Sequence, residues 1–212
     1  MEPVLKFFVL FLVVVEPLSL VPIFAVLSAG QDESYRRRMA SRAVIISSCI
    51  CLLFAIAGAQ LLQVLGIGLP AFRIGSGILL FMIALDMVFA RASPIRTTTS
   101  KEQDEVKHRQ DISVFPLAFP LITGPGALAT ILLAFGESGH SWKIFSGLII
   151  AMALVLFLAW LAMRLSAPMM RVMGVTGANV ISRLFGVILA ALGAQYVIDG
   201  ISGVVTVYAS RF

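Results

Sequence analysis

Two proline pairs lie inside apolar segments, and residues around each pair could bind a small solute. Prolines five residues apart occur at positions 17 and 22, and again 103 residues later at positions 120 and 125. Because proline lacks a backbone N–H and clashes with the preceding turn, each pair should break a helix. A helix broken at membrane depth exposes polar backbone, which is tolerated where it lines a cavity. The candidate substrate-binding residues are Glu16, Pro17, Ser19, Pro22, Pro120, Thr123, Gly124, Pro125 and Gly126.

The two breaks would create new helix N-termini, one near Ser19 and one near Gly126. A helix N-terminus carries unpaired N–H groups and about half a unit of positive charge, so it favours a carboxylate. Gly124 and Gly126 would let a ligand approach the backbone closely. Ser19 and Thr123 could add hydroxyl contacts. The alternative is that the prolines only kink two packed helices, as is common in membrane proteins.

Two carboxylates are candidates for proton coupling. Glu16 lies near the middle of the first apolar segment, where an ionised side chain costs at least about 2.5 kcal/mol. Burial would favour its protonated form, which makes Glu16 a candidate proton carrier. Alternatively, Glu16 steadies the broken backbone and never changes its protonation. Asp86, five residues before Arg91, is the second candidate, or else a snorkelling residue in a local ion pair.

The composition requires a membrane around these elements. Of the 212 residues, 59% are hydrophobic and only 13% are charged, against about 25% in soluble proteins. No charge occurs in 43–72 or in 112–136, and a membrane-spanning helix needs about 20 apolar residues. The sequence predicts an all-α membrane protein with six transmembrane helices at 4–29, 42–65, 71–90, 112–136, 143–165 and 180–206, of which the first and fourth are broken at the proline pairs.

The chain divides into two halves around a polar segment. Residues 91–111 hold nine charged residues and separate a first three-helix repeat, 1–90, from a second, 112–212. With the N-terminus outside, twelve Lys and Arg residues fall inside and four outside, a strong positive-inside bias. This topology predicts a cytoplasmic linker and periplasmic termini. Because three helices per half is an odd number, the repeats should be inverted, which is typical of secondary transporters.

Other classes of site have no pattern in the sequence. We find no metal-ligand spacing, no nucleophile triad and no nucleotide-binding loop, so we expect neither an enzyme nor a cofactor or metal. His108 and His140 fall in expected loops. Cys49 and Cys51 are two residues apart on one helix and therefore point in different directions. The net charge of +5 is spread over alternating loops, which argues against a nucleic-acid partner.

Two motifs resemble those of a known family. The stretch Glu16-Pro17-Leu18-Ser19-Leu20-Val21-Pro22-Ile23-Phe24 resembles the first-helix motif of the MarC family, also designated UPF0056, and Pro116-Leu117-Ala118-Phe119-Pro120-Leu121-Ile122-Thr123-Gly124-Pro125-Gly126 is similar to its fourth-helix motif. The segments Arg73-Ile74 to Asp86 and Asp199-Gly200-Ile201 also fit. The resemblance covers essentially the whole chain. The family more often has Asp or Asn in place of Glu16, and Gly in place of Ser19, so the presumed cavity should be narrower here.

The resemblance implies a six-span bacterial or archaeal inner-membrane protein. Related archaeal members transport small neutral amino acids such as glycine and alanine, driven by the proton gradient. We therefore expect a secondary transporter of small zwitterionic solutes in the bacterial inner membrane. An exporter of small metabolites or antibiotics is one alternative, and a non-transporting envelope scaffold or regulatory protein is another. The expected partners are an amino acid-like substrate and the lipid bilayer, with homo-oligomers as an option.

Overall fold

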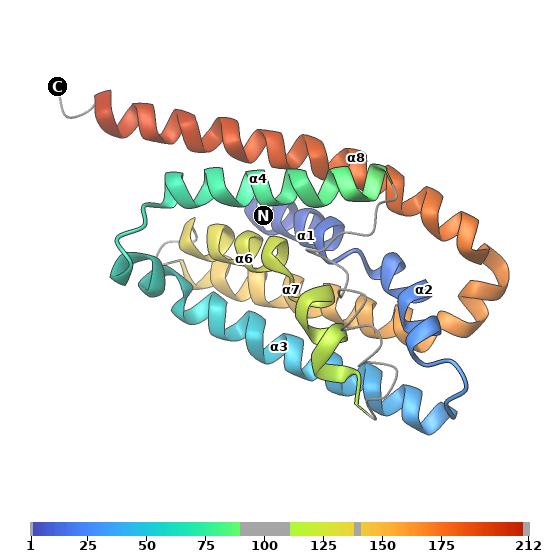
Figure 1. Cartoon of the computed structure of the whole chain (residues 1–212). Helices are drawn as coiled ribbons and strands as arrows, with labels where there is room; N and C mark the ends of the chain where they lie inside the picture. Colours follow the sequence, from blue (N-terminus) through green and yellow to red (C-terminus); the bar gives the residue numbers. More distant parts are fainter. Residues whose placement is uncertain (1, 90–110, 138–140, 210–212) are drawn as a thin grey trace.

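The computed structural model describes residues 2–89, 111–137 and 141–209, and every regular element in these ranges is a helix (Figure 1). Seven elements are α-helices, and one, η1, is wound as a π-helix. Their bounds are α1 Glu2–Val15, α2 Pro17–Leu27, α3 Glu33–Val64, α4 Leu69–Val88, η1 Ser113–Ile122, α6 Pro125–Glu137, α7 Trp142–Arg164 and α8 Ser166–Ala209.

The predicted class is confirmed, with a membrane-spanning set close to the expected six. Five segments of the described chain are long and apolar enough to cross a membrane: Glu2–Leu27, Glu33–Val64, Leu69–Val88, Trp142–Arg164 and Asn179–Thr206. A sixth span forms if η1 and α6, which meet at a bend of 57°, are counted as one broken helix. The first span is broken too, between α1 and α2.

Two helices begin earlier than the sequence predicts. α3 begins at Glu33 rather than near residue 42, because the Asp32 side chain accepts a hydrogen bond of 2.9 Å from the Tyr35 amide and caps the helix. α8 begins at Ser166 rather than near 180, and Gly174 (φ 62°, ψ 179°) kinks it before the spanning part. Both predictions covered only the apolar part of the helix, whereas α3 extends back through Arg36, Arg37 and Arg38 and α8 extends back beyond Gly174.

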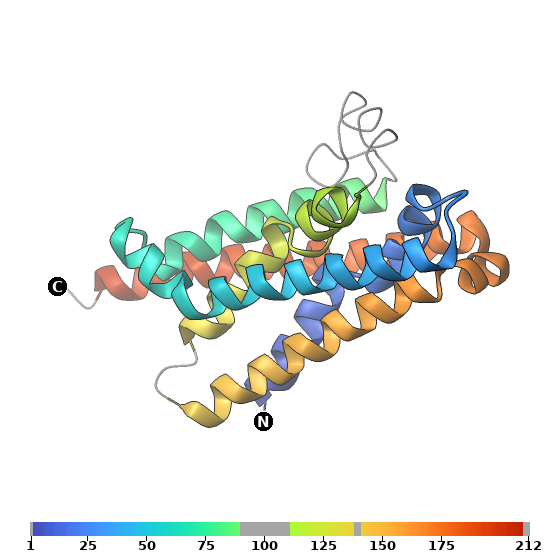
Figure 2. The same ribbon diagram turned by 90° about the horizontal axis from the view of Figure 1, so that it is seen from below.

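The broken helices lie between two unbroken layers. Figures 1 and 2 show α4 and α8 side by side along one face, with α1 and α6 beneath them and α3 and α7 on the opposite side. α1 and α2 pack on α7, and η1 and α6 pack on α3. α1 also contacts α6 directly. Each broken span thus packs on the second helix of the other half, α7 or α3. The inverted repeat and the linker at 91–111 stay predictions.

α4 and α8 form the most extensive helix contact in the described structure because glycines let their backbones meet. A Cβ atom added at Gly77 of α4 would lie 2.6 Å from the Gly193 carbonyl oxygen of α8. One added at Gly193 would lie 2.7 Å from the Phe81 amide nitrogen. Close approach through small residues is the usual way that helices associate in lipid.

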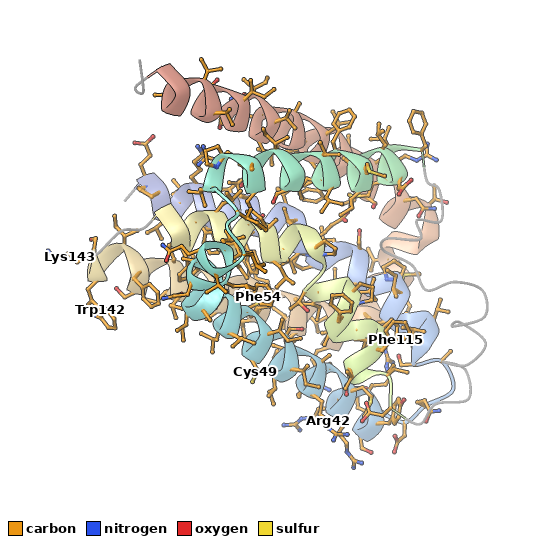
Figure 3. The ribbon with its side chains drawn as sticks, turned by 60° about the vertical axis from the view of Figure 1, so that its left-hand side comes forward. Arg42, Cys49, Phe54, Phe115, Trp142 and Lys143 are labelled. Carbon is orange, nitrogen blue, oxygen red and sulfur yellow. The ribbon has the colours of Figure 1, made fainter. Side chains whose placement is uncertain are left out.

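The two ends of the bundle differ in their charged contacts. Figure 3 places Arg42 at one end and Trp142 and Lys143 at the other. At the Arg42 end, Arg42 pairs with Asp111 at 2.6 Å, and Arg164 on α7 pairs with Glu33 on α3 at 2.7 Å. These contacts tie α3 to the start of η1 and to the end of α7.

Candidate functional site

The first break consists of one residue, Glu16, between α1 and α2. The Glu16 backbone adopts the left-handed conformation (φ 50°, ψ 65°), which costs a non-glycine residue about 1–2 kcal/mol. Pro17 is the first residue of α2, a position where its missing N–H is tolerated, and its ring disfavours a right-handed helical conformation at Glu16. Pro17 also cannot donate to the carbonyl of Val13. The chain therefore turns sharply at a residue whose side chain is only 1% exposed.

Both prolines of the first pair belong to α2. Pro22 lies inside this helix without ending it, so the break falls before Pro17 and not between the two prolines. Ser19 lies in the first turn of α2, and its hydroxyl is 3.3 Å from that of Ser182 on α8. Ser19 thus joins the first broken helix to α8.

The second break begins with η1, a segment whose prolines prevent a regular α-helix. Phe115 and Phe119 have extended conformations, with φ, ψ of −130°, 125° and −128°, 129°. Each precedes a proline, Pro116 or Pro120, through a cis peptide bond. A residue before proline is disfavoured in the helical region, so a regular α-helix cannot run through two such positions four residues apart.

The second break ends in a tight turn that fixes Thr123 and Gly124. The amide and the hydroxyl of Thr123 both donate to the Ala118 carbonyl, at 2.9 and 2.8 Å. A Cβ atom at Gly124 would lie 2.6 Å from the Pro120 carbonyl oxygen, so only glycine fits this turn. α6 then begins at Pro125, and the Leu128 amide donates to the Gly124 carbonyl at 3.1 Å.

A small enclosed space lies at the start of α6. We name it the break cavity; its volume is about 20 Å³, and it is lined by Val14, Leu80, Ile83, Pro120, Leu121, Ile122, Gly124, Pro125, Gly126, Ala127 and Leu189. The amides of Gly126 and Ala127 belong to the first turn of α6, where N–H groups have no partner within the helix. The side chains from α1, α4 and α8 in this lining are apolar, so the polar part of the cavity comes from the backbone of the second break.

The break cavity is too small for a solute in the described conformation. A buried water needs about 10–15 Å³, so this space has room for about one water and is too small for an amino acid. Gly126 permits this close packing, since a Cβ atom there would lie 2.7 Å from Leu80 Cδ2 and 3.1 Å from Val14 Cγ1. The N-terminal end of α6, which is the positive end of its dipole, therefore lies directly against α1 and α4.

The predicted binding residues divide into two groups in the structure. Pro120, Gly124, Pro125 and Gly126 line the break cavity. Among the other predicted residues, Thr123 is fully buried with its hydroxyl bonded to Ala118, and the residues of the first break, Glu16, Pro17, Ser19 and Pro22, are outside the lining. The first broken helix reaches the cavity through Val14 instead.

Sequence reasoning missed the apolar wall of the break cavity. The structure also places Asp86, a predicted proton-coupling residue, outside the lining of this cavity. Leu80, Ile83 and Leu189 come from α4 and α8, where they resemble many lipid-facing residues and give no signal. Asp86 is half-buried on α4, one turn beyond Ile83, and it is not part of the lining. Its expected neighbour Arg91 lies outside the described residues, as do His108 and His140.

One carboxylate outside the membrane-spanning segments anchors the second break. Asp111 accepts hydrogen bonds from the Ser113 amide, at 2.9 Å, and from the Ser113 hydroxyl. These two bonds, and then the charge of Arg42, hold the pKa of Asp111 below its ordinary value of 3.8. Since Ser113 is the first residue of η1, Asp111 fixes the start of the π-wound segment.

Comparisons with known proteins agree over nearly the whole chain. The family model described as "MarC family integral membrane protein" matches residues 1–205. The chain is 32% identical to the UPF0056 membrane protein YhcE of Escherichia coli strain K12 over 199 residues, which cover 94% of this chain and 92% of that protein. It is 34% identical over 204 residues to the UPF0056 membrane protein YvbG of Bacillus subtilis strain 168, with 96% of both chains covered.

An archaeal protein is similar to the same extent. The UPF0056 membrane protein MJ1677 of Methanocaldococcus jannaschii is 32% identical over 190 residues, which cover 90% of this chain and 91% of that protein. No solved structure gives a significant match.

Proposed function

The chain belongs to the MarC family of integral membrane proteins, and from this premise we propose that it is a secondary transporter of small zwitterionic solutes of the glycine and alanine type. The observation that carries the proposal is the start of α6, where Gly126 and Ala127 of its first turn line the break cavity beside Val14 of the first broken helix. A helix N-terminus in an enclosed apolar space favours a carboxylate. Broken helices of this kind form the substrate sites of many secondary transporters.

The size of the break cavity supports a small substrate. It must expand to admit even glycine, and its walls are packed side chains, so every added substrate atom requires further movement. This supports small neutral amino acids over the alternative of antibiotics, which would need a much larger site. The charge distribution supports one orientation of the chain in a bacterial inner membrane, with both termini periplasmic and residues 91–111 cytoplasmic. Labelling a cysteine introduced after residue 100 from the periplasm would overturn that topology.

The movement that opens the cavity is proposed to separate the broken helices from the α4 and α8 pair. In transporters built from two repeats, alternating access is largely a rocking of one repeat against the other. α4 belongs to the first half and α8 to the second, yet Gly77 and Gly193 bring their backbones together. We therefore place the moving surface between this pair and α1, α2, η1 and α6, with Glu16 or Asp86 carrying the coupled proton.

Uptake into proteoliposomes tests the proposal. Purified protein should exchange and accumulate labelled glycine and alanine, and it should do so far better than leucine or ethylamine, the decarboxylated analogue of alanine. A pH gradient should drive accumulation. Protein that is correctly folded and inserted but moves none of these solutes would support the non-transporting scaffold instead, and efflux of antibiotics without amino acid exchange would support the exporter.

A further inference from the structure

A second and larger cavity lies at the opposite end of α6 from the break. Its volume is about 310 Å³, at the lower end of the roughly 300–1,000 Å³ that is usual for small-molecule sites. The walls come from α1, α4, α6, α7 and α8. We name it the outer cavity, because on the proposed topology it faces the periplasm, and its polar lining residues are Lys6, Arg73, Thr130, Tyr196 and Asp199.

The outer cavity and the break cavity are lined by four of the same helices at different depths. On α1 the lining passes from Leu10 to Val14, and on α6 from Thr130 to Gly126. On α4 and α8 it passes over seven residues, from 73 to 80 and from 196 to 189. Since an α-helix rises 1.5 Å per residue, these steps separate the two linings by about 6–10 Å.

A hydrogen bond of Thr130 and an aromatic pair on α1 adjoin the outer cavity on the side of the break. The Thr130 hydroxyl, which is part of the outer lining, donates to the Gly126 carbonyl at 2.9 Å. Thr130 shares the outer lining with Tyr196 and with the charged residues Arg73 and Asp199. Phe7, also in the outer lining, stacks on Phe11 with ring centroids 5.3 Å apart. The first turn of α6 is therefore linked through Thr130 to the charged groups of the outer cavity.

The charges of the outer cavity suit a zwitterion. Lys6 and Arg73 are two cations from α1 and α4, and Asp199 is a carboxylate on α8 that accepts a hydrogen bond of 2.7 Å from Gln195. Arg73 and Asp199 are half-buried, so their charges act through less solvent than those of an open surface. Groups of both signs around one space can receive the carboxylate and the ammonium of one amino acid.

We propose that the outer cavity is an external binding site where a small amino acid docks before it enters the break cavity, with Lys6 and Arg73 receiving its carboxylate and Asp199 its ammonium group. This inference rests on the proposed transport function. It adds a second site on the same route, and in the described conformation the outer cavity, at about 310 Å³, is far larger than the break cavity, at about 20 Å³.

Protection of an introduced thiol tests the site without requiring transport. In a background with Cys49 and Cys51 replaced by alanine, Ala134→Cys places a thiol in the lining of the outer cavity. A membrane-impermeant thiol reagent added from the periplasmic side should modify it, and alanine should slow that modification. Propionate, which lacks the ammonium group, should protect less, and ethylamine, which lacks the carboxylate, should not protect. Ser141→Cys, at the exposed start of α7 outside the lining, is the matched control and should react at the same rate with or without alanine.

Charge variants identify the groups that hold the ligand. Arg73→Gln should raise the alanine concentration needed for half-protection by about 10- to 100-fold, as expected for loss of a bond between charged groups. Arg73→Lys should restore part of the affinity, which separates a charge effect from misfolding. Lys143→Gln removes a cation from the same end of the molecule but outside the lining, and it should change nothing.

The outcomes separate this inference from the transport proposal. Protection by alanine without any uptake would support the outer site and overturn transport. Normal uptake with no protection at Ala134→Cys, or with equal protection at Ser141→Cys, would overturn the outer site and leave transport standing. Modification of Ala134→Cys only from the cytoplasmic side would overturn its assignment as the external site.

Discussion

The two breaks share one proline spacing but are built differently. At the first, Pro17 begins α2 and Pro22 lies inside it; at the second, Pro120 lies inside η1 and Pro125 begins α6. Corresponding prolines thus have exchanged roles. Adding the offset of 103 residues, Val21 corresponds to Gly124, and Val13 corresponds to Pro116.

These differences explain why the cavity belongs to the second break. Gly124 allows the tight turn against Pro120, and Pro116 makes the preceding segment too irregular for an α-helix. The first break has neither residue and turns at Glu16 alone. A short break leaves two helices that fill space around it, whereas a long break exposes backbone that a solute can contact. Equal proline spacing therefore locates the breaks but does not determine which of them opens a site.

Filling the second break should have the largest effect. Gly126→Val adds atoms that meet Leu80 and Val14, so it fills the break cavity and pushes α6 away from α1 and α4. A displacement of about 1 Å at a reaction or binding site can cost about 100-fold, and we expect at least that loss of alanine uptake in proteoliposomes. Ile23→Val, at the corresponding position of the first break, is the control and should keep near-normal uptake. Equal losses in both variants would mean that the two breaks contribute alike.

The next effect concerns the first break and its buried carboxylate. Glu16→Gln keeps the size and the left-handed backbone but cannot release a proton. If Glu16 carries the coupled proton, this variant should still exchange alanine but should not accumulate it under a pH gradient. Asp86→Asn is the matched test of the other candidate, measured in the same vesicles. Normal accumulation by Glu16→Gln would assign the residue a structural role only.

A smaller effect is expected on stability when the turn of the second break is altered. Gly124→Ala forces a Cβ atom against the Pro120 carbonyl oxygen, and overpacking of this kind costs about 1–3 kcal/mol. The midpoint of thermal unfolding in detergent should fall. Gly75→Ala, where a Cβ atom meets nothing within 4 Å, should leave it unchanged or raise it slightly. An unchanged midpoint combined with lost alanine binding would instead mean that Gly124 serves ligand approach and not the turn.

The smallest effect is a pH dependence confined to the second break. The folded pKa of Asp111 is lowered, first by its bonds to Ser113. Its carboxylate therefore contributes its full stability above the unfolded value of 3.8 and loses it as the pH falls through the lower folded value. Because the side chain is 42% exposed, solvent screens the effect to below about 1 kcal/mol. Asp111→Asn should remove this part of the acid sensitivity in thermal unfolding. Asp32→Asn, at a site away from η1, should leave the contribution of Asp111 to the acid sensitivity in place.

Much of the fold follows from residues that act locally. The apolar runs located the spans, and the proline pairs located the breaks, because these effects depend on a few neighbouring residues. The new helix starts were predicted near Ser19 and Gly126, and they lie at Pro17 and Pro125. The predicted starts of α3 and α8 were too late, since the prediction overlooked the Asp32 cap of α3 and the part of α8 that precedes the kink at Gly174. The sequence also left open which side of each break faces a cavity.

There is a physical reason why the sequence does not predict the apolar wall of the break cavity. In a soluble protein, a hydrophobic residue marks the interior, but lipid accepts the same side chains on the outside. Leu80 is 1% exposed and lines the break cavity, whereas Leu79, its neighbour, is 38% exposed. Only the packing of α4 on α6 and α8 distinguishes the two positions.

α4 and α8 are far apart in the order of synthesis, although they touch through their backbones. Gly77 emerges from the ribosome 116 residues before Gly193, which lies in the last helix of the described chain. Until α8 enters the membrane, the groove around Gly77 can contact only lipid or an insertion factor. We therefore expect a nascent chain stopped before α8 to remain incompletely assembled and open to membrane proteases. Biogenesis of this protein would then be completed by its last helix.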